Sequence, residues 1–311
     1  MKELSIVSNQ LFLFSFLYVV GILSAKLKII RSSDLDSLAK FIVNVTMPLM
    51  LFTTITNGPK IDALKDITPI FLWYSIVIGL LFLVSGLVIK IFKIKDEHKN
   101  LFRATFVFGN TGFIGIPLIL SLFPQSGIIY ISGCMIIDQL LLWTVGIWLT
   151  KPVKPGESQG FFQEFKNIIN PSVISIFLAV ICLMLGFRLP NLLNQAFSQV
   201  GNLTTALALI YVGGLFFFTD KKSMFKNIDA YLIVMIKMLI IPVLLFLICK
   251  QAGAFTDQIK VILVLLALPS MSSLVIFAKI NNSDSRYTLA NITLSTILSL
   301  LTIPVLIFLF N

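Results

Sequence analysis

The amino-acid sequence predicts an all-helical (all-α) protein that crosses a lipid bilayer ten times. Its 311 residues are 57% hydrophobic and 12% charged, and the mean hydropathy is +0.98. The charged fraction is about half of that expected in a soluble domain. Ten apolar runs approach or exceed the roughly 20 residues that a spanning helix needs. Two of these runs are interrupted near their middle by proline and small polar residues.

Short polar loops separate most of the predicted spans. The spans occupy about residues 5–25, 36–56, 67–91, 101–123, 127–149, 168–187, 194–218, 229–250, 258–279 and 286–310. The longest polar stretch contains prolines, glycines and charges, and it separates five spans from five others. We therefore expect a first five-helix repeat over residues 1–150, a cytoplasmic linker over 151–167 and a second repeat over 168–311.

The positions of the basic residues predict how the chain is oriented. Seventeen of the 24 Lys and Arg residues lie in or beside the loops that follow spans 1, 3, 5, 7 and 9, and six lie on the opposite side. Because cytoplasmic loops are enriched in Lys and Arg, we expect these loops in the cytoplasm and both termini outside. With five spans in each half, the second half then enters the bilayer from the other side, so the two halves are expected to be inverted repeats.

Span 4 contains the first interruption. Residues 109–117 have the sequence Gly-Asn-Thr-Gly-Phe-Ile-Gly-Ile-Pro between two apolar arms. Pro117 removes a backbone donor and clashes with the preceding turn, and each glycine costs about 1 kcal/mol in a helix relative to alanine. Hydrocarbon offers no water to the freed peptide groups, so broken backbone is tolerated where it is buried in protein or lines a wet cavity. This pattern predicts a discontinuous helix at a transport site.

Span 9 contains the second interruption, at the corresponding place in the second half. Its apolar run is broken by Pro269, Ser270, Met271, Ser272 and Ser273. Paired interruptions in inverted halves are typical of secondary transporters, whose half-helix ends supply partial charges near the bilayer midplane. The alternative is that prolines and glycines serve as plain kinks or close-packing points. The matching positions of the two interruptions favour the transport site.

The motifs at these interruptions resemble those of a known family. Residues 110–118, Asn-Thr-Gly-Phe-Ile-Gly-Ile-Pro-Leu, are similar to the first crossover of the auxin efflux carrier family, which includes plant PIN-type carriers and bacterial permeases for malate or other organic acids. Residues 267–269 and 277–279 resemble the second crossover and its exit. The resemblance covers essentially the whole chain. It implies a scaffold domain, a transport domain whose broken helices cross at the substrate site, elevator-like movement and a homodimer.

The resemblance also implies which residues contact the substrate. Asn110 matches the crossover asparagine that contacts the carboxylate of an anionic substrate in the family, and Pro117 and Pro269 match the crossover prolines. Further candidates, by position in the same breaks, are Thr111, Gly115, Ser270, Met271, Ser272 and Ser273. An amide can donate to a carboxylate, and free backbone amides at a half-helix start favour negative charge. For each serine, a hydroxyl bonded to its own helix carbonyl is the alternative interpretation.

Three further polar residues are predicted within the membrane. Asp138 is central in span 5 and Lys237 is central in span 8, where a charge costs at least about 2.5 kcal/mol. They form either a proton relay or charge-compensating pair that resets the carrier, or a fixed ion pair or polar anchor between helices. In span 2, Asn44 lies near Pro48, and it is expected to line the cavity or to mark a helix kink.

Other classes of function find less support in the sequence. The net charge of +10 lies in short loops without a continuous stripe, so nucleic-acid binding is not expected. His98 is interpreted as a solvated loop residue, the three cysteines lack ligand spacing, and no phosphate-binding glycine loop occurs, so neither metal nor cofactor is predicted. Aromatic residues such as Tyr74 are interpreted as interface belts or packing. An intramembrane hydrolase needs more than the single central acid, Asp138, so no enzyme activity is expected.

The sequence thus predicts a secondary carrier in the cytoplasmic membrane, surrounded by lipid, that moves small organic anions such as malate or auxin-like acids. The alternative is a sodium- or proton-coupled bile-acid-type symporter, or a cation/proton exchanger, of related inverted-repeat fold. Exchangers normally place acids beside the crossing, and neither break contains Asp or Glu. Plant carriers are expected to have an acidic and a basic residue in span 2, and the deep part of this span has neither, which argues against auxin itself.

Overall fold

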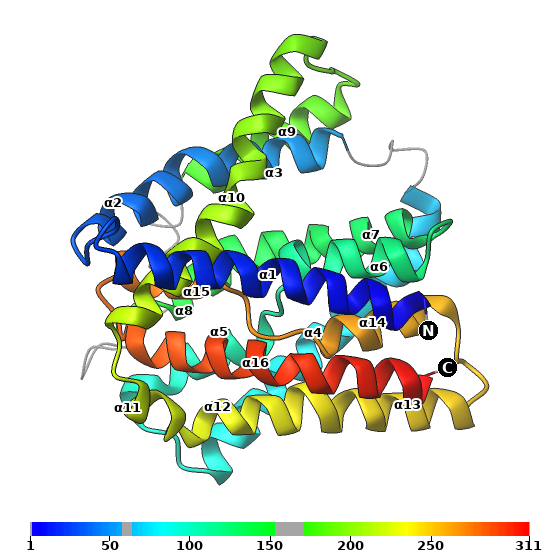
Figure 1. Ribbon diagram of the computed structural model, residues 1–311. Coiled ribbons are helices and arrows are strands. Elements are labelled where there is room, and N and C mark those ends of the chain that lie inside the picture. The colour runs from blue at the N-terminus through cyan, green and yellow to red at the C-terminus, as the bar shows by residue number, and fades with distance from the viewer. Residues whose placement is uncertain (1, 58–63, 153–170, 311) are drawn as a thin grey trace.

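Helices occupy each of the ten ranges that the sequence marks as spans (Figure 1). The computed structural model describes residues 2–57, 64–152 and 171–310. The first half contains α1 (Lys2–Lys26), α2 (Asp34–Phe41), α3 (Met47–Thr56), α4 (Leu64–Ile91), α5 (Lys99–Val107), α6 (Ile116–Leu122), α7 (Gly127–Leu141) and α8 (Ile147–Leu149). The second half contains α9 (Pro171–Met184), α10 (Asn191–Phe218), α11 (Lys221–Phe225), α12 (Ile228–Leu232), α13 (Ile241–Gln251), α14 (Asp257–Leu266), α15 (Ser273–Ile280) and α16 (Ser285–Phe310).

The length and apolar character of these helices confirm a polytopic membrane protein. Within the described ranges, six helical segments are long and apolar enough to cross a membrane by themselves. Large apolar side chains such as Phe308, which is 86% exposed, point away from the protein, where lipid would cover them. The number of ten crossings and the inverted relation of the halves stay predictions. Most of the predicted linker, from residue 153 onward, lies outside the described residues.

Several spans contain π-helical segments that the sequence analysis does not predict. In the described part of the chain these segments are η1 (Ile42–Thr46), η4 (Thr111–Gly115), η5 (Leu142–Gly146) and η7 (Ile233–Ile240). After three of them, the second residue of the next helix is a proline: Pro48, Pro117 or Pro242. Proline lacks an amide hydrogen and its ring crowds the carbonyl one turn earlier, so a widened turn before it relieves the clash. The kink predicted at Pro48 takes this form.

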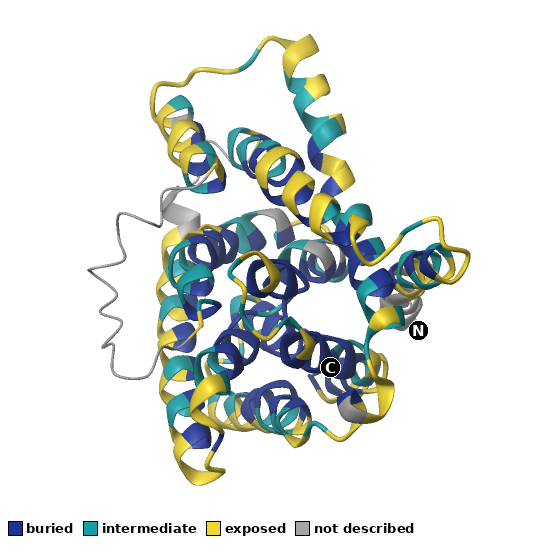
Figure 2. Cartoon of the chain, turned by 90° about the vertical axis from the view of Figure 1, so that its left-hand side faces the viewer, coloured by how far each residue is buried: buried dark blue, intermediate teal, exposed yellow. Residues whose placement is uncertain are grey.

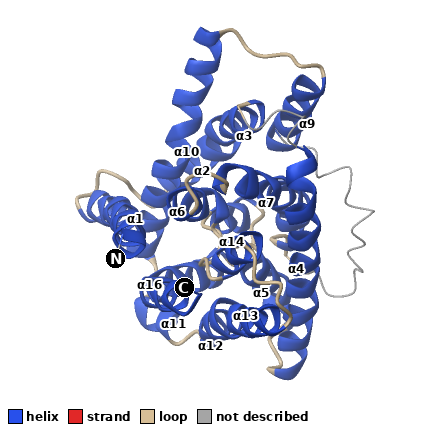
Figure 3. Cartoon of the chain, turned by 90° about the vertical axis from the view of Figure 1, so that its right-hand side faces the viewer, coloured by secondary structure: helices blue, strands red, loops and turns tan. Residues whose placement is uncertain are grey.

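The helices form two groups (Figures 1 and 3). In the first group, α10 packs against α1 and α3, and α3 packs against α9. The contact between α1 and α10 is very close, because a Cβ atom at Gly21 would lie 2.2 Å from the Ile210 carbonyl oxygen. A Cβ atom at Gly213 would lie 2.1 Å from the Tyr18 carbonyl oxygen. Small residues therefore set the distance between these two helices, as is common in membranes.

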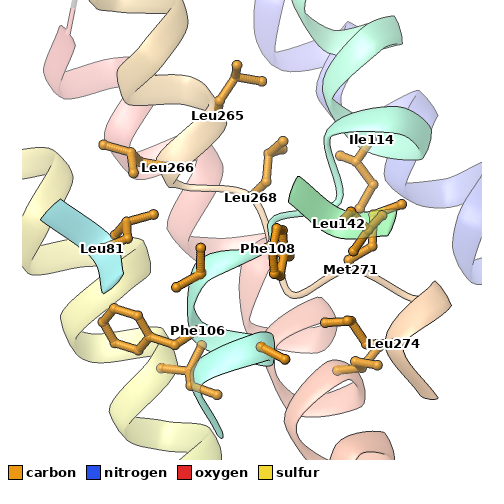
Figure 4. Packing of buried hydrophobic residues seen from close by; sticks show 14 of the residues in the cluster. Leu81, Phe106, Phe108, Ile114, Leu142, Leu265, Leu266, Leu268, Met271 and Leu274 are labelled. Atoms are coloured by element: carbon orange, nitrogen blue, oxygen red, sulfur yellow. The ribbon is translucent and has the colours of Figure 1, made fainter. Parts of the chain in front are cut away.

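The second group surrounds the two broken spans, 4 and 9. Every residue from 261 to 278 is buried, so the middle of span 9 touches protein on all sides (Figure 2). Figure 4 shows Phe108 of span 4 between Leu268 and Met271 of span 9, and all three belong to the buried apolar cluster. The buried apolar cluster of the described residues therefore includes residues in and around both breaks.

The two ends of the chain lie on the same side of the molecule. Figure 1 shows the start of α1 and the end of α16 at one end, and the loops after α1, α10 and α15 at the opposite end. The loop before α5 joins this opposite end, because His98 contacts Asp284 there. The predicted topology requires this arrangement, whereas its orientation relative to the cytoplasm stays a prediction.

Candidate functional site

Spans 4 and 9 are both discontinuous, and their breaks meet inside the second group of helices. In span 4, α5 ends at Val107 and the helix resumes at Thr111, the first residue of η4. In span 9, α14 ends at Leu266 and α15 begins at Ser273. The two predicted interruptions are thus present, and four half-helix ends come together at one place.

The extended residues of the two breaks pair with each other. Gly109 and Ser270 form a single antiparallel β-bridge. The Asn110 amide donates to the Pro269 carbonyl at 2.8 Å, and the Met271 amide donates to the Phe108 carbonyl at 3.0 Å. Peptide groups freed by a broken helix must find partners inside a membrane protein, and here each break supplies them to the other. We call this paired region, residues 108–111 and 267–273, the crossing.

Asn110 lies at the centre of the crossing and is 1% exposed. Its side-chain Nδ2 donates to Ser272 Oγ at 3.1 Å. Its own carbonyl accepts the amides of Ile114 and Gly115, which begins the π-helical turn. The residue that the family resemblance assigns to the substrate carboxylate therefore also links the two breaks.

The serines of the second break have different environments. Ser270 donates from its hydroxyl to the Thr105 carbonyl at 2.7 Å, and its amide donates to Ser295 Oγ at 3.1 Å. The Thr105 carbonyl lies in the last turn of α5, so Ser270 satisfies an acceptor that the interrupted helix leaves open. Ser272 accepts from Asn110, and the Ser273 hydroxyl is buried without a hydrogen-bond partner. For Ser270, a bond to its own helix, the alternative considered above, is therefore wrong.

Two residues at half-helix starts have buried hydroxyls without partners. Thr111 is the first residue of η4 and Ser273 is the first residue of α15, and neither hydroxyl has a partner at normal hydrogen-bond distance and angle, although Thr111 lies close enough to Asp138 and Tyr74 to interact with them. Buried polar groups normally have a partner, so an unpaired one needs an explanation. Helix starts also carry a partial positive charge of about half an elementary charge. Both half-helices that begin at the crossing thus offer an unused polar atom and a favourable potential for an anion.

Gly115 and the two prolines shape the backbone of the crossing. A Cβ atom at Gly115 would lie 2.9 Å from Leu268 Cδ1 and 3.1 Å from Leu265 Cδ2, so glycine permits close contact between the breaks. Pro117 lies in the first turn of α6, where a missing amide hydrogen costs little. Pro269 contributes its carbonyl oxygen to the bridge. The structure therefore gives these three residues a clear role in the backbone geometry.

Asp138 lies in α7 next to the first break and is buried. Tyr74 of α4 donates to Asp138 Oδ1 at 2.8 Å, whereas Oδ2 has no hydrogen-bond partner. Thr111 lies beside both residues. Tyr74 is thus a buried partner of the central acid, and its interpretation as an interface or packing residue is incomplete.

Lys237 lies in η7 and is 1% exposed. Its Nζ donates to the Leu268 carbonyl oxygen in the second break. Among the ion pairs of the described residues, none joins Lys237 to Asp138. The two buried charges interact electrostatically but form hydrogen bonds with different partners. Lys237 thus fits the polar anchor considered above, and a role of either charge in resetting the carrier stays a prediction.

Comparison with known proteins agrees with this geometry. The sequence matches the family described as "Membrane transport protein" over residues 6–307. The chain belongs to this family, the auxin efflux carriers. A relative from Methanocaldococcus jannaschii, described as an uncharacterized transporter, is 22% identical over 295 residues, which cover 92% of this chain and 93% of the relative.

The structure places one predicted substrate residue of this family member away from the crossing. Asn44 lies in η1, its side chain is exposed, and its Nδ2 donates to the Lys40 carbonyl at 2.9 Å. The π-helical segment at this place corresponds to the kink that the sequence analysis offered as the alternative. A role of Asn44 in the cavity stays a prediction without a contact to support it.

The interpretation of His98 as a solvated loop residue is wrong. Its side chain is 17% exposed, Nε2 lies 3.3 Å from Asp284 Oδ2, and the ring stacks on Tyr287 with the centroids 4.0 Å apart. The hydrogen bond from His98, followed by those from the amides of Tyr287 and Arg286, holds the pKa of the Asp284 carboxyl below its ordinary value. No local pattern around His98 indicates a partner that lies 186 residues away.

Proposed function

We propose that the protein is a secondary carrier that moves small organic anions, such as malate or auxin-like acids, and binds them at the crossing. The main observation in support is that both half-helices beginning there start with a buried, unpartnered hydroxyl, at Thr111 and Ser273. An anion with several oxygen atoms can accept hydrogen bonds from such hydroxyls and from nearby backbone amides. Pro117, Pro269 and Met271 shape the backbone of this site rather than donate to the substrate.

The charges around the crossing also support an anionic substrate. Two helix starts contribute partial positive charge, and the Lys237 ammonium lies against the second break. Asp138 is the acid beside this region, and the Tyr74 hydroxyl already donates to one of its oxygens. The two helix ends at the same place carry the opposite partial charge, so the preference is local: a carboxylate placed against the starts of η4 and α15 meets positive potential there.

The arrangement of helices supports an elevator-type movement. The crossing lies within the second group of helices, whereas α1, α3, α9 and α10 form a separate group that could remain fixed. Helices at corresponding places in the two halves end alike, with a residue of positive φ. Lys28 follows span 1 as Gly186 follows span 6, and Lys93 follows span 3 as Gly253 follows span 8. Such matching ends favour two inverted repeats. A homodimer in the cytoplasmic membrane, with both termini outside, belongs to the same proposal.

Substitution of Asn110 tests the proposal. Purified protein in proteoliposomes is expected to take up radiolabelled malate or another carboxylate from a panel. Asn110→Ala removes the amide that joins both breaks and faces the substrate, so uptake is expected to fall at least about tenfold, equivalent to roughly 1.4 kcal/mol of lost binding.

Asn194→Ala is the matched control, because Asn194 is exposed and its amide donates to Asn57 in the first group of helices. This variant is expected to transport at the wild-type rate. A carboxylate that the wild type transports, and that Asn110→Ala transports equally well, would remove Asn110 from the site. Failure of every carboxylate in the panel would count against the proposed substrate class.

A further inference from the structure

The side chain of Lys237 ends at the carboxyl end of a half-helix. The last turn of α14 closes with the Ala267 amide donating to Leu263 and the Leu268 amide donating to Leu265. Leu268 follows the C-cap residue Ala267, so its carbonyl belongs to the unwound backbone of the break, directly beyond the open terminal carbonyls of α14. The Lys237 ammonium donates to this carbonyl, and Lys237 is 1% exposed.

The space for the ammonium is bounded by both breaks. A Cβ atom at Gly109 would lie 3.3 Å from Lys237 Nζ and 3.4 Å from the Leu265 carbonyl oxygen. The ammonium thus lies between the end of α14 and the first break, in a space that a larger residue at position 109 would narrow. Lys237 reaches this point from the widened helix η7, which precedes Pro242.

The negative potential at the end of α14 normally attracts a cation. A helix end carries about −0.5 elementary charge, spread over its open carbonyl groups. In carriers with broken helices, unwound carbonyls and half-helix carboxyl ends coordinate the coupling Na⁺ or H⁺. The Lys237 ammonium brings a full positive charge and three donors to the same kind of place. Its position is fixed by the chain, so it cannot leave during transport.

We propose that the Lys237 ammonium is a tethered cation that takes the place of a dissociable coupling ion at the end of α14. The wild-type protein then binds no alkali cation at this position, and removal of the side chain creates a vacant site for a small monovalent cation. If the proposed function is right, it follows that carboxylate uptake needs no Na⁺. This last consequence rests on the proposed function, whereas the cation site itself does not.

Thermal unfolding of the purified protein in detergent, followed by tryptophan fluorescence, tests the cation site without any substrate. Wild type is expected to unfold at the same temperature in NaCl and in choline chloride of equal ionic strength. Lys237→Ala is expected to unfold roughly 5 °C lower in choline chloride, because the Leu268 carbonyl loses a charged donor. Ethylammonium chloride or NaCl is expected to restore most of this loss, since these cations fit a space that choline does not.

Lys237→Met is the matched control, because its side chain fills the space without a charge. It is expected to be less stable than wild type and to gain nothing from Na⁺ or ethylammonium. Equal rescue of Lys237→Met and Lys237→Ala would place the cation elsewhere and overturn the proposal. So would rescue of Lys237→Ala by choline, wild-type stability in Lys237→Ala, or a Na⁺-specific stabilisation of the wild type.

Two further measurements cover the cases in which Lys237→Ala does not fold or the proposed function is wrong. If Lys237→Ala does not fold, its recovery in membranes of cells grown with ethylammonium supports the proposal, and Na⁺-specific stabilisation of the wild type still overturns it. Malate uptake by the wild type is then compared in Na⁺ and choline buffers. Absence of malate uptake in both buffers counts against the proposed function and leaves the unfolding results to decide on Lys237.

Discussion

The two breaks pair with each other at the crossing, but the protein holds them in different ways. All residues of the second break, 267–272, are buried, whereas Gly109 and Gly112 in and beside the first break are partly exposed. Three other helical segments fix the second break, since Ser270 binds Thr105 and Ser295 and the Leu268 carbonyl accepts from Lys237. The first break has Asn110 joined to its partner and Thr111 without a hydrogen bond.

This difference suggests a division of tasks between the breaks. A polar group that already has a protein partner contributes stability and gains little from a ligand. A buried polar group without a partner gains a hydrogen bond when a ligand arrives. We therefore expect substitutions of partnered residues in the second break, such as Ser270, to change mainly stability. Substitutions of the unpartnered hydroxyls that begin the two half-helices, Thr111 and Ser273, are expected to change mainly transport.

Among the variants that test this division of tasks, Ser270→Ala is expected to have the largest effect, on the free energy of unfolding. The variant removes the donor to the Thr105 carbonyl, and it should lower the free energy of unfolding by about 1 to 2 kcal/mol. Unfolding of the purified protein in detergent measures this change. Ser299→Ala is the control, because the buried Ser299 hydroxyl donates within its own helix, to the Thr296 carbonyl. Equal stability of the two variants would show that the Ser270 hydroxyl does not support the second break.

A smaller effect, and one of another kind, is expected from Thr111→Val. This nearly isosteric variant removes a hydroxyl that has no protein partner, so the unfolding temperature should stay at the wild-type value. Carboxylate uptake at low substrate concentration should fall about fivefold, which corresponds to roughly 1 kcal/mol of lost binding. Thr204→Val, at another buried and unpartnered hydroxyl in α10, should leave both properties unchanged. Lower stability of Thr111→Val with unchanged uptake would reverse the proposed division of tasks.

The smallest change in stability is expected at the contact between His98 and Asp284, which joins the outer ends of the two broken spans. His98 precedes α5 and Asp284 follows α15, and their hydrogen bond lowers the pKa of the Asp284 carboxyl. A lowered folded-state pKa means that the charge stabilises the fold above the unfolded-state value of about 3.9, and that this stability is lost as the pH falls through the lowered pKa.

Asp284→Asn should therefore reduce stability by a few tenths of a kcal/mol at neutral pH, because water screens a side chain that is 46% exposed. The difference from wild type should shrink as the pH falls below about 3.9 and vanish below the lowered pKa of Asp284, which unfolding at several pH values measures. Asparagine keeps an acceptor for the amides of Arg286 and Tyr287, so the start of α16 is preserved. A difference that persists unchanged in acid would show that the carboxylate charge is not its cause.

Much of the helical pattern could be predicted from the sequence. The ten predicted ranges lie within about three residues of the observed helical segments, because a membrane restricts spanning segments to long apolar helices. The positions of both breaks follow equally directly, since proline and small polar residues in such a run leave peptide groups open. The π-helical turns before Pro48, Pro117 and Pro242 have a local cause as well, but the sequence analysis does not predict them.

The partners of the polar side chains could not be predicted in the same way. The sequence shows that Lys237 and Asp138 are charged and deep, but it does not show that Lys237 binds the Leu268 carbonyl and Asp138 binds Tyr74. Tyr74 and His98 resemble ordinary membrane-interface and loop residues in their own segments. Each acquires its role from a residue more than 60 positions away.

The sequence by itself determined that this chain is a set of membrane helices with two interruptions at corresponding places. That follows from apolar run length and from the backbone chemistry of proline and glycine, which act over a single turn. The tertiary structure decided that the two interruptions pair, that Lys237 caps one of them, and that Thr111 and Ser273 are left without partners. These features depend on how helices from distant parts of the chain pack, because a hydrogen bond is made only where two groups meet in space.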